Sequence, residues 1–378
     1  MDKIRTAVIG CGAISDAYMN NLKNRFTVIE LAACTDLDES RSRAKAEKYG
    51  IPVMTTEQIL ADPSIGMVVN LTNPAAHYAV NKAALLAGKH VYSEKMIAVT
   101  AAEADELIAI AEEKGVQIGT APDTFLGATL QTARYLIDHG VIGQVVSCEA
   151  SMSRNYGIYG DILPHLRKPG GGICMDVGCY YMTALAALLG PAEQVFAYSG
   201  TSRPERIDSR TTNASFGQPY TLQVENAVAA SVRYRSGVIG TLHFNSDCIF
   251  DEDRSLKIFG TEGILSIDDP NQFGSKLTLR KPFHPAVEFP FTHGFENESR
   301  GLGAAELAWS VYRGRTARTA GYMNRHLLEM IGGMLGSGES GRPYTLRSAF
   351  TQPAMLPPGY VSREEYGMWS PTEETALA

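Results

Sequence analysis

Residues 5–15 read RTAVIGCGAIS, a short apolar run that closes in a glycine turn and decides the fold of the first part of the chain. A helical stretch, residues 17–24, and a second apolar run, residues 28–34, follow the turn. Strand, glycine turn, helix and strand in this order are the context that a dinucleotide-binding fingerprint needs. We therefore predict a dinucleotide site at the turn.

Each position of the glycine turn has a physical reason. Gly10 permits a tight bend, and Gly12 lets the backbone approach a pyrophosphate, which the unpaired N–H groups at the start of the helix attract. Ser15 replaces the third glycine of the fingerprint and is small enough to pack against a strand. The residues of this turn expected to contact the cofactor are Gly10, Gly12, Ala13 and Ile14.

Asp36 follows the second strand directly. A carboxylate there can accept both ribose hydroxyls and repels the extra phosphate of NADP, so we expect the cofactor to be NAD rather than NADP. The alternative role for Asp36 is a cap on a helix that starts near Glu39, and Asp38 can fill that role instead.

Strands and helices continue to alternate up to residue 122. Strands are expected over residues 67–71, 90–92 and 116–120, and helices over 77–87 and 101–114, the second opened by a Thr100/Glu103 capping box. Such alternation predicts a parallel, doubly wound α/β sheet whose ligand crevice lies beyond the carboxyl ends of its strands. The residues at such ends are Gly12, Asp36, Thr72, Asn73, Glu94 and Lys95. Residues 1–122 are therefore predicted to form an NAD-binding Rossmann domain.

Residues 123–378 have a different rhythm. Helices are expected over residues 128–139, 176–189, 302–313 and 324–335, and strands over 145–151, 227–234, 238–245, 256–259 and 264–267. This pattern predicts an α+β domain on a large, open, mostly antiparallel sheet, which binds the substrate. An uncovered sheet face needs a cover, so we expect a homodimer or homotetramer, with the tail after Pro357 as an arm over a neighbour.

Composition narrows the function classes. The chain has 378 residues, a net charge of -7 and 20% charged residues, which argues against nucleic-acid and anionic-membrane partners. We find no signal-peptide pattern and no apolar stretch that approaches the roughly 18 residues of a membrane span, so a cytoplasmic location is expected. The six cysteines are scattered without metal-ligand spacing, which favours free thiols and no metal site.

The chemistry is predicted to lie in residues 170–180, GGGICMDVGCY. Asp176 and Tyr180 are four residues apart, on one face near a helix start. Oxidation of an alcohol carbon needs a group that removes the hydroxyl proton, and a phenol needs a nearby cation to do so near neutral pH. Lys95 can supply that cation, and Asp176 can orient the hydroxyl or the lysine. The alternatives are a helix cap for Asp176 and a core position for Tyr180.

The chain resembles the Gfo/Idh/MocA oxidoreductases over nearly its whole length. The stretches that carry the resemblance are residues 10–12 (GCG), 88–95 (GKHVYSEK), 122–127 (PDTFLG), 170–180, 180–185 (YYMTAL) and 299–303 (SRGLG). The resemblance implies that Lys95 contacts substrate and nicotinamide, that Asp176 lies beside it and that Tyr180 is the acid/base. It also implies that Thr72, Asn73, His77 and Glu94 line the cofactor. The tyrosine variant is more similar to glucose–fructose oxidoreductase and dihydrodiol dehydrogenase than to inositol dehydrogenase.

Met96 departs from the family's Glu-Lys-Pro motif. A flexible methionine in place of proline is expected to loosen the placement of the nicotinamide ring or to admit a larger substrate. In the loop that follows the 145–151 strand, Tyr156 and His165 are candidates for binding sugar hydroxyls, the alternative being an ordinary solvated loop. His326 is expected to make a structural hydrogen bond.

Three functions remain open. The first is an NAD-dependent dehydrogenase that moves a hydride between nicotinamide and a hydroxyl-bearing carbon of a sugar, glycoside or cyclitol. The second is a redox-neutral enzyme that oxidises and re-reduces a glycoside on a retained NAD. The third is a non-catalytic sensor of NAD or sugar, a use to which one fold can be put as readily as catalysis.

Overall fold

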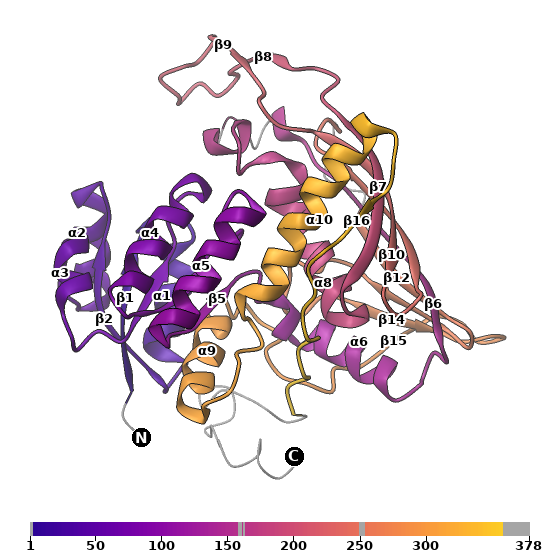
Figure 1. Ribbon diagram of the computed structural model, residues 1–378, viewed down its shortest axis with the longest axis horizontal. Helices are drawn as coiled ribbons and strands as arrows, with labels where there is room; N and C mark the ends of the chain where they lie inside the picture. Colours follow the sequence, from indigo (N-terminus) through magenta and orange to yellow (C-terminus); the bar gives the residue numbers. More distant parts are fainter. Residues whose placement is uncertain (1–2, 158–160, 162, 249–253, 358–378) are drawn as a thin grey trace.

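The computed structural model describes residues 3–157, 161, 163–248 and 254–357, and these form two sheets with helices around and between them (Figure 1). The tail after Pro357 and residues 158–160 of the expected sugar-binding loop lie outside the described residues.

The first sheet is parallel throughout and has the strand order β2-β1-β3-β4-β5. Its strands are β1 (Ile4–Ile9), β2 (Ile29–Thr35), β3 (Met67–Asn70), β4 (His90–Ser93) and β5 (Ile118–Thr120). Its helices are α1 (Ser15–Asn24), α2 (Glu39–Tyr49), α3 (Thr56–Ala61), α4 (Pro74–Leu86) and α5 (Ala101–Lys114). The predicted doubly wound sheet is thus confirmed. The strand order reverses between β1 and β3, and ligands bind such sheets at this reversal.

Local chemistry explains the helix ends of this sheet. The Thr100 hydroxyl accepts from the N–H of Glu103 at 3.2 Å and the Glu103 carboxylate accepts from the N–H of Thr100 at 3.0 Å, which is the expected capping box. Asp38 caps α2 by accepting from the N–H of Ser40 at 3.0 Å. Asp36 is therefore free of the capping role.

The second sheet is large and mostly antiparallel, as predicted, with the order β15-β14-β13-β12-β6-β11-β10-β7-β16 and one parallel pair, β6 with β11. Its strands are β6 (Val145–Ser153), β7 (Ala192–Gly200), β10 (Ala227–Tyr234), β11 (Ile239–Asn245), β12 (Arg254–Gly260), β13 (Ile264–Ile267), β14 (Leu277–Arg280), β15 (Val287–Glu288) and β16 (Tyr344–Thr345). The strands β8 (Glu205–Ile207) and β9 (Pro219–Thr221) form a separate hairpin.

Helices cover one face of the second sheet. They are α6 (Ala128–Asp138), α8 (Cys179–Leu189) and α10 (Gly321–Ser340), which lie on the same side of the sheet in Figure 1. Burial alternates along β10: Val228 and Val232 are buried, whereas Ser231 and Arg233 are exposed. The sheet therefore has one packed and one open face.

The last two long helices join the two sheets. Helix α9 (Leu302–Arg313) packs against β4 and β5, and α10 packs against both α5 and β7. The N–H of Thr120 donates to the carbonyl of Thr319 at 2.9 Å, and Arg325 of α10 pairs with Asp105 of α5 at 2.6 Å. These contacts hold the ends of the first sheet against the second part of the chain.

The helix expected over residues 176–189 begins differently. Residues Cys174–Gly178 form a wider π-helical turn, and α8 starts only at Cys179. Such turns are frequent at functional sites. Short 3-10 turns cover Thr124–Leu126 and Pro164–Arg167. Among the described residues, we find no helix with the length and apolar character needed to span a membrane.

Candidate functional site

A cavity of about 470 Å³ lies at the carboxyl ends of β1, β3 and β4, where the two parts of the chain meet. From the first part it is lined by Gly12, Ala13, Ile14, Leu71, Thr72, Asn73, Pro74, His77, Glu94 and Lys95. From the second part it is lined by Arg154, Leu163, His165, Leu166, Gly170, Met175, Asp176, Val177, Tyr180, Asn271 and Arg300. The cavity therefore has a backbone-rich end at the glycine turn and a charged end across from it.

The glycine-turn end fits a dinucleotide. Gly10 has a φ of +102°, and a Cβ there would lie 2.6 Å from the carbonyl carbon of Leu71, so only glycine suits this position. A Cβ on Gly12 would meet no atom within 4 Å, so the protein's own packing does not require glycine there. The space next to Gly12 is open for a ligand that approaches the backbone.

The start of α1 offers donors to that ligand. Within the described residues, the N–H groups of Gly12, Ala13 and Ile14 have no hydrogen-bond acceptor, and no side chain caps the helix. Ser15 is buried and donates from its hydroxyl to the carbonyl of Gly12 at 2.6 Å, which fastens the turn. Unpaired N–H groups at a helix start suit a pyrophosphate.

Asp36 lies beside the same turn but outside the cavity lining. Its two carboxylate oxygens accept from the N–H of Cys11 at 2.6 Å and from the N–H of Asp38 at 2.8 Å. The carboxylate is thereby oriented from behind, and its partly exposed position keeps it accessible to a ligand. Each carboxylate oxygen has a second lone pair for a further donor.

Glu94 and Lys95 extend from β4 into the charged end. The Glu94 carboxylate accepts from the hydroxyl of Tyr18 at 2.7 Å and from the N–H of Lys95 at 2.9 Å. The Lys95 ammonium donates to the carboxylate of Asp176 at 2.8 Å and to the carbonyl of Asp176 at 2.6 Å. One lysine therefore connects the two parts of the chain across the cavity.

Asp176 sits on the π-helical turn and forms the centre of this network. Its carboxylate also accepts from the hydroxyl of Tyr156 and lies 3.6 Å from the guanidinium of Arg154. Burial alone would raise the pKa of Asp176, but the Lys95 cation and these donors hold it below its ordinary value. The pKa of Lys95 is raised above its ordinary value although burial lowers it, because Asp176 faces it. Both shifts favour the charged pair.

Tyr180 completes the charged end. Its side chain is 8% exposed, and the Lys95 nitrogen lies 5.5 Å from the ring centroid. Burial raises the pKa of Tyr180 to about 12, against the opposing effect of Lys95. In the part of the chain that the structure describes, its hydroxyl has no hydrogen-bond partner, so this group is available to a ligand.

His77 ties together the loops that follow β3 and β4. One ring nitrogen lies 2.7 Å from the carbonyl oxygen of Met96 and the other lies 2.9 Å from that of Thr72. Asn70 accepts from both the N–H and the hydroxyl of Thr72, at 3.1 and 2.7 Å. The cofactor loop predicted from Thr72, Asn73 and His77 thus lines the cavity as one connected unit.

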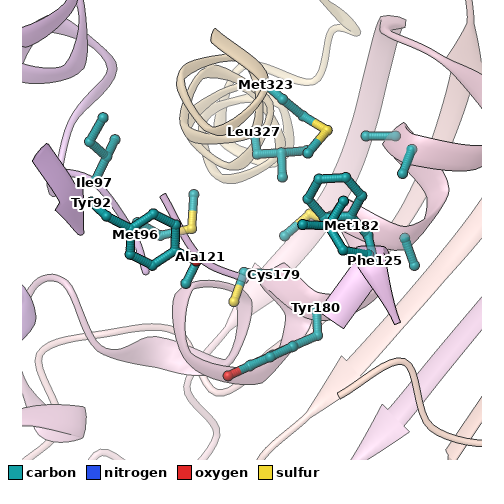
Figure 2. Packing of buried hydrophobic residues seen from close by; sticks show 14 of the residues in the cluster. Tyr92, Met96, Ile97, Ala121, Phe125, Cys179, Tyr180, Met182, Met323 and Leu327 are labelled. Atoms are coloured by element: carbon teal, nitrogen blue, oxygen red, sulfur yellow. The ribbon is translucent and has the colours of Figure 1, made fainter. Parts of the chain in front are cut away.

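Met96 is a buried core residue. Its side chain is 2% exposed, does not line the cavity and packs in the core, where Figure 2 shows it near Tyr92 and Ala121. The Asn324 amide of α10 lies 3.5 Å from its sulfur. The methionine side chain is thus held by packing outside the cavity lining, and its effect on ring placement or substrate size stays a prediction.

The cavity lining contains most of the predicted site residues, but not all of them. Gly10, Asp36 and Tyr156 lie behind the lining, the last against Asp176. Arg154, Asn271 and Arg300 also line the cavity. Arg154 opens the loop that is expected to bind sugar hydroxyls, and the signal for Arg300 was its place directly before Gly301 in the SRGLG stretch. His326 makes structural hydrogen bonds as expected, to the N–H of Ala192 at 3.0 Å and to Ser348 at 2.8 Å.

Known proteins share this architecture. An Ensifer adhaerens 1,5-anhydro-D-fructose reductase is 29% identical over 289 residues, which make up 74% of this chain and 78% of that protein. A Bos taurus trans-1,2-dihydrobenzene-1,2-diol dehydrogenase is 24% identical over 310 residues, 77% of this chain and 84% of that protein. A solved structure of levoglucosan dehydrogenase with NADH and L-sorbose shares the fold, with a TM-score of 0.80 at 16% identity over 92% of this chain and 99% of that one.

Two family descriptions match the chain in consecutive segments. Residues 4–121 match an oxidoreductase family with an NAD-binding Rossmann fold. Residues 130–266 match the GFO/IDH/MocA C-terminal domain. The glycine turn, the Lys95–Asp176 pair and both matches agree, and the chain belongs to the Gfo/Idh/MocA family of NAD-binding oxidoreductases.

Proposed function

We propose that this protein oxidises or reduces a hydroxyl-bearing carbon of a sugar, glycoside or cyclitol with NAD as the redox partner. The observation that carries the proposal is the ion pair between Lys95 and Asp176 next to the unpartnered hydroxyl of Tyr180, in one cavity with the glycine turn. The names of the relatives, a 1,5-anhydro-D-fructose reductase and a dihydrodiol dehydrogenase, support a cyclic polyol as the substrate class.

In the proposed roles, NAD, when bound, would supply the acceptor or donor of the hydride that the substrate carbon exchanges. The N–H groups of Gly12, Ala13 and Ile14 hold its pyrophosphate, Asp36 its adenosine ribose, and the loop of Thr72, Asn73 and His77 together with Glu94 its nicotinamide half. Gly10 shapes the turn. We propose the same division for the chain as a whole, with residues 1–122 for the cofactor and residues 123–378 for the substrate.

The side chains at the charged end then move the proton. In oxidation, the phenolate of Tyr180 takes the proton of the substrate hydroxyl; in reduction, the phenol returns it. Lys95 stabilises the phenolate and donates a hydrogen bond to the substrate oxygen, while Asp176 keeps the lysine charged and in place. Because burial raises the pKa of Tyr180 to about 12, the phenol form prevails near neutral pH. The oxidation rate is thus expected to increase as the pH rises, because oxidation needs the phenolate. Reduction uses the phenol, which is already the main form near neutral pH.

Two further residues are proposed to support substrate binding, one by direct contact and one indirectly. His165 lines the cavity, where burial lowers its pKa and favours the neutral ring, which can both donate to and accept from sugar hydroxyls. Tyr156 acts from behind by orienting Asp176. The open face of the second sheet supports the proposal of a homodimer or homotetramer. A cytoplasmic location is proposed from the sequence pattern alone.

The first experiment is NADH formation by the purified protein with NAD, against a panel of hexoses, glycosides and inositols, with NADP in parallel. A signal that depends on one substrate class and disappears in Lys95→Ala would support the proposal. No signal with any substrate, together with NAD released only on denaturation, would contradict a net dehydrogenase and favour the redox-neutral enzyme or the sensor.

Asp36 tests the choice of cofactor separately. Replacement of Asp36 by Ala removes the charge that repels the NADP phosphate, so the preference for NAD should fall by roughly tenfold or more. The ratio of kcat/KM for the two cofactors measures it. Asp38→Ala, which removes a helix cap on the same loop, is the matched control and should leave the ratio unchanged.

A further inference from the structure

Arg300 reaches the charged end of the cavity from the loop that precedes α9, and the roles given above do not use it. Its side chain is 12% exposed. It lines the same cavity as Tyr180 and Lys95 but comes from a different segment from either. Arg300 therefore adds a cation to the cavity besides Lys95 and Arg154.

The backbone around Arg300 is held by a buried carboxylate. One oxygen of Asp123 accepts from the N–H of Gly301 and from the N–H of Gly303, both at 3.0 Å. Gly301 has a φ of +96°, and a Cβ on Gly303 would lie 2.4 Å from the Tyr92 hydroxyl oxygen, so both positions require glycine. The hydrogen bonds to Asp123 and the close approach to Tyr92 fix the position of this loop, which places Arg300 at the cavity.

The guanidinium is held as well. One of its nitrogens donates to the side-chain oxygen of Asn271 at 2.9 Å, and another pairs with the carboxylate of Glu298. Glu298 also accepts from the backbone N–H of Arg300 at 3.0 Å. An arginine braced at both ends has lost its rotamer freedom before any ligand arrives, which is the property of a preorganised charge.

Titratable groups from several elements surround Tyr180. Lys95 and Glu94 come from the loop after β4, Asp176 and Cys179 from its own helical segment, and Arg300 from the loop before α9. His77, His165, Arg154 and Tyr156 surround the same end. Burial raises the pKa of Tyr180, whereas Lys95 and Arg300 both lower it. Apart from burial, Tyr180 has the largest influence on the pKa of Arg300 and raises it. Because both residues line the same cavity, the Arg300 cation is placed to stabilise a negative charge that develops on Tyr180.

We propose that Arg300 is a positioning residue that works with Lys95 to stabilise the phenolate of Tyr180. The proposal rests on the proposed function, in which the Tyr180 phenol first releases its proton to water. The phenolate oxygen then forms a bond to the proton of the substrate hydroxyl as the O–H bond breaks, and the carbon's hydride passes to NAD⁺. The substrate becomes a carbonyl, NAD⁺ becomes NADH and Tyr180 is again a phenol. Arg300 acts before the redox step, because its positive charge increases the fraction of Tyr180 that is present as phenolate.

The test is a titration of position 180 that needs neither cofactor nor turnover. Tyrosine 180 is replaced in the full-length protein by 3,5-difluorotyrosine, whose more acidic phenol titrates at accessible pH, and its ¹⁹F shift is followed. Arg300→Gln should raise the midpoint by about one pH unit or more, because an opposite charge is lost. Arg300→Lys should restore most of the shift. Arg280→Gln, which removes an exposed arginine on β14, should leave the midpoint unchanged.

An unchanged midpoint in Arg300→Gln would overturn the proposal. If that variant does not fold, Asn271→Ala removes one anchor of the guanidinium and should raise the midpoint by a smaller amount; no change there would overturn the proposal equally. On the substrate identified for the wild type, Arg300→Gln should lower kcat/KM for oxidation and for reduction by a similar factor, up to about tenfold, at pH values well below the midpoint, because a substitution cannot change the overall equilibrium of the reaction. A shifted midpoint without turnover on any polyol would contradict the proposed function and leave the Arg300–Tyr180 coupling standing.

Discussion

The two ends of the cavity are built in opposite ways. The glycine-turn end consists of backbone N–H groups from consecutive residues, 12–14, and a glycine whose missing side chain leaves space. The charged end consists of side chains from segments far apart in the chain, Lys95, Asp176 and Arg300 among them. If the proposed roles hold, cofactor binding depends on local backbone shape, whereas the proposed chemistry depends on how the two parts of the chain are held together.

The largest loss of activity should come from substitution of Lys95, which connects the two parts of the chain through Asp176. Lys95→Ala removes the cation beside Tyr180 and leaves the Asp176 carboxylate without its partner, so oxidation should fall by roughly a thousandfold. Steady-state kinetics with NAD measure the loss. The exposed lysine at the end of α5, in Lys114→Ala, is the control and should keep the wild-type rate. A Lys95→Ala enzyme with more than a tenth of the wild-type rate would break the comparison.

Alanine substitutions at Gly10 and Gly12 should distinguish a glycine that the fold requires from one that ligand binding requires. Gly12→Ala adds a Cβ that meets no protein atom, so unfolding should be unchanged while NAD binds at least about tenfold more weakly, because the new methyl group occupies ligand space. Gly10→Ala forces a positive φ and a clash with Leu71, so the free energy of unfolding should fall by about 1–3 kcal/mol.

Denaturant unfolding and calorimetric titration with NAD check both variants. The contradicting outcome is the reverse pattern, in which Gly12→Ala unfolds more easily or Gly10→Ala keeps full stability.

The smallest effect concerns Asp123, the carboxylate behind the Arg300 loop. Burial raises its pKa to about 6, although the N–H groups of Gly303 and Gly301 oppose the rise. A carboxyl whose pKa is higher in the folded than in the unfolded protein stabilises the fold most when protonated. That contribution is complete below about pH 4 and is lost as the pH rises through about 6.

The free energy of unfolding of the wild type should therefore rise relative to that of Asp123→Asn as the pH falls. The rise is expected to reach up to about 2 kcal/mol between about pH 7 and about pH 4. Denaturant unfolding at both pH values gives the difference. A pH-independent difference would show that Asp123 titrates normally and that burial does not act on it as described.

The sequence was sufficient for the first sheet because its signals are local. The run from Ile4 to Ile9, the Gly10 turn and the Thr100 capping box each specify structure within a few residues. The expected role of Asp36 as something other than a cap could be argued because Asp38 stood beside it. The position of Lys95 opposite Asp176 could be predicted only by combining two separate signals. One is the strand end before Lys95, and the other is the predicted helix start near Asp176, 81 residues further along the chain.

Features that depend on long-range packing were not predicted. Strands β14 to β16 and the hairpin of β8 and β9 are two to four residues long, too short to show a period in the sequence. The π-helical turn at Cys174–Gly178 shares its composition with an ordinary helix. Arg300 and Asn271 have no motif of their own, and the glycines beside Arg300 acquire meaning only when Asp123 and Tyr92 are seen against them. The core contact of Met96 with Asn324 of α10 could not be predicted, because the two residues lie 228 positions apart in the chain.

The most direct test of the account compares Tyr180→Phe with the wild type in two measurements on the same preparation, the Kd for NAD and the single-turnover rate of substrate oxidation. We expect an NAD affinity within about twofold of wild type and an oxidation rate lower by at least about a hundredfold, since only the proton acceptor is lost. A Tyr180→Phe enzyme that oxidises the substrate at the wild-type rate would contradict this expectation.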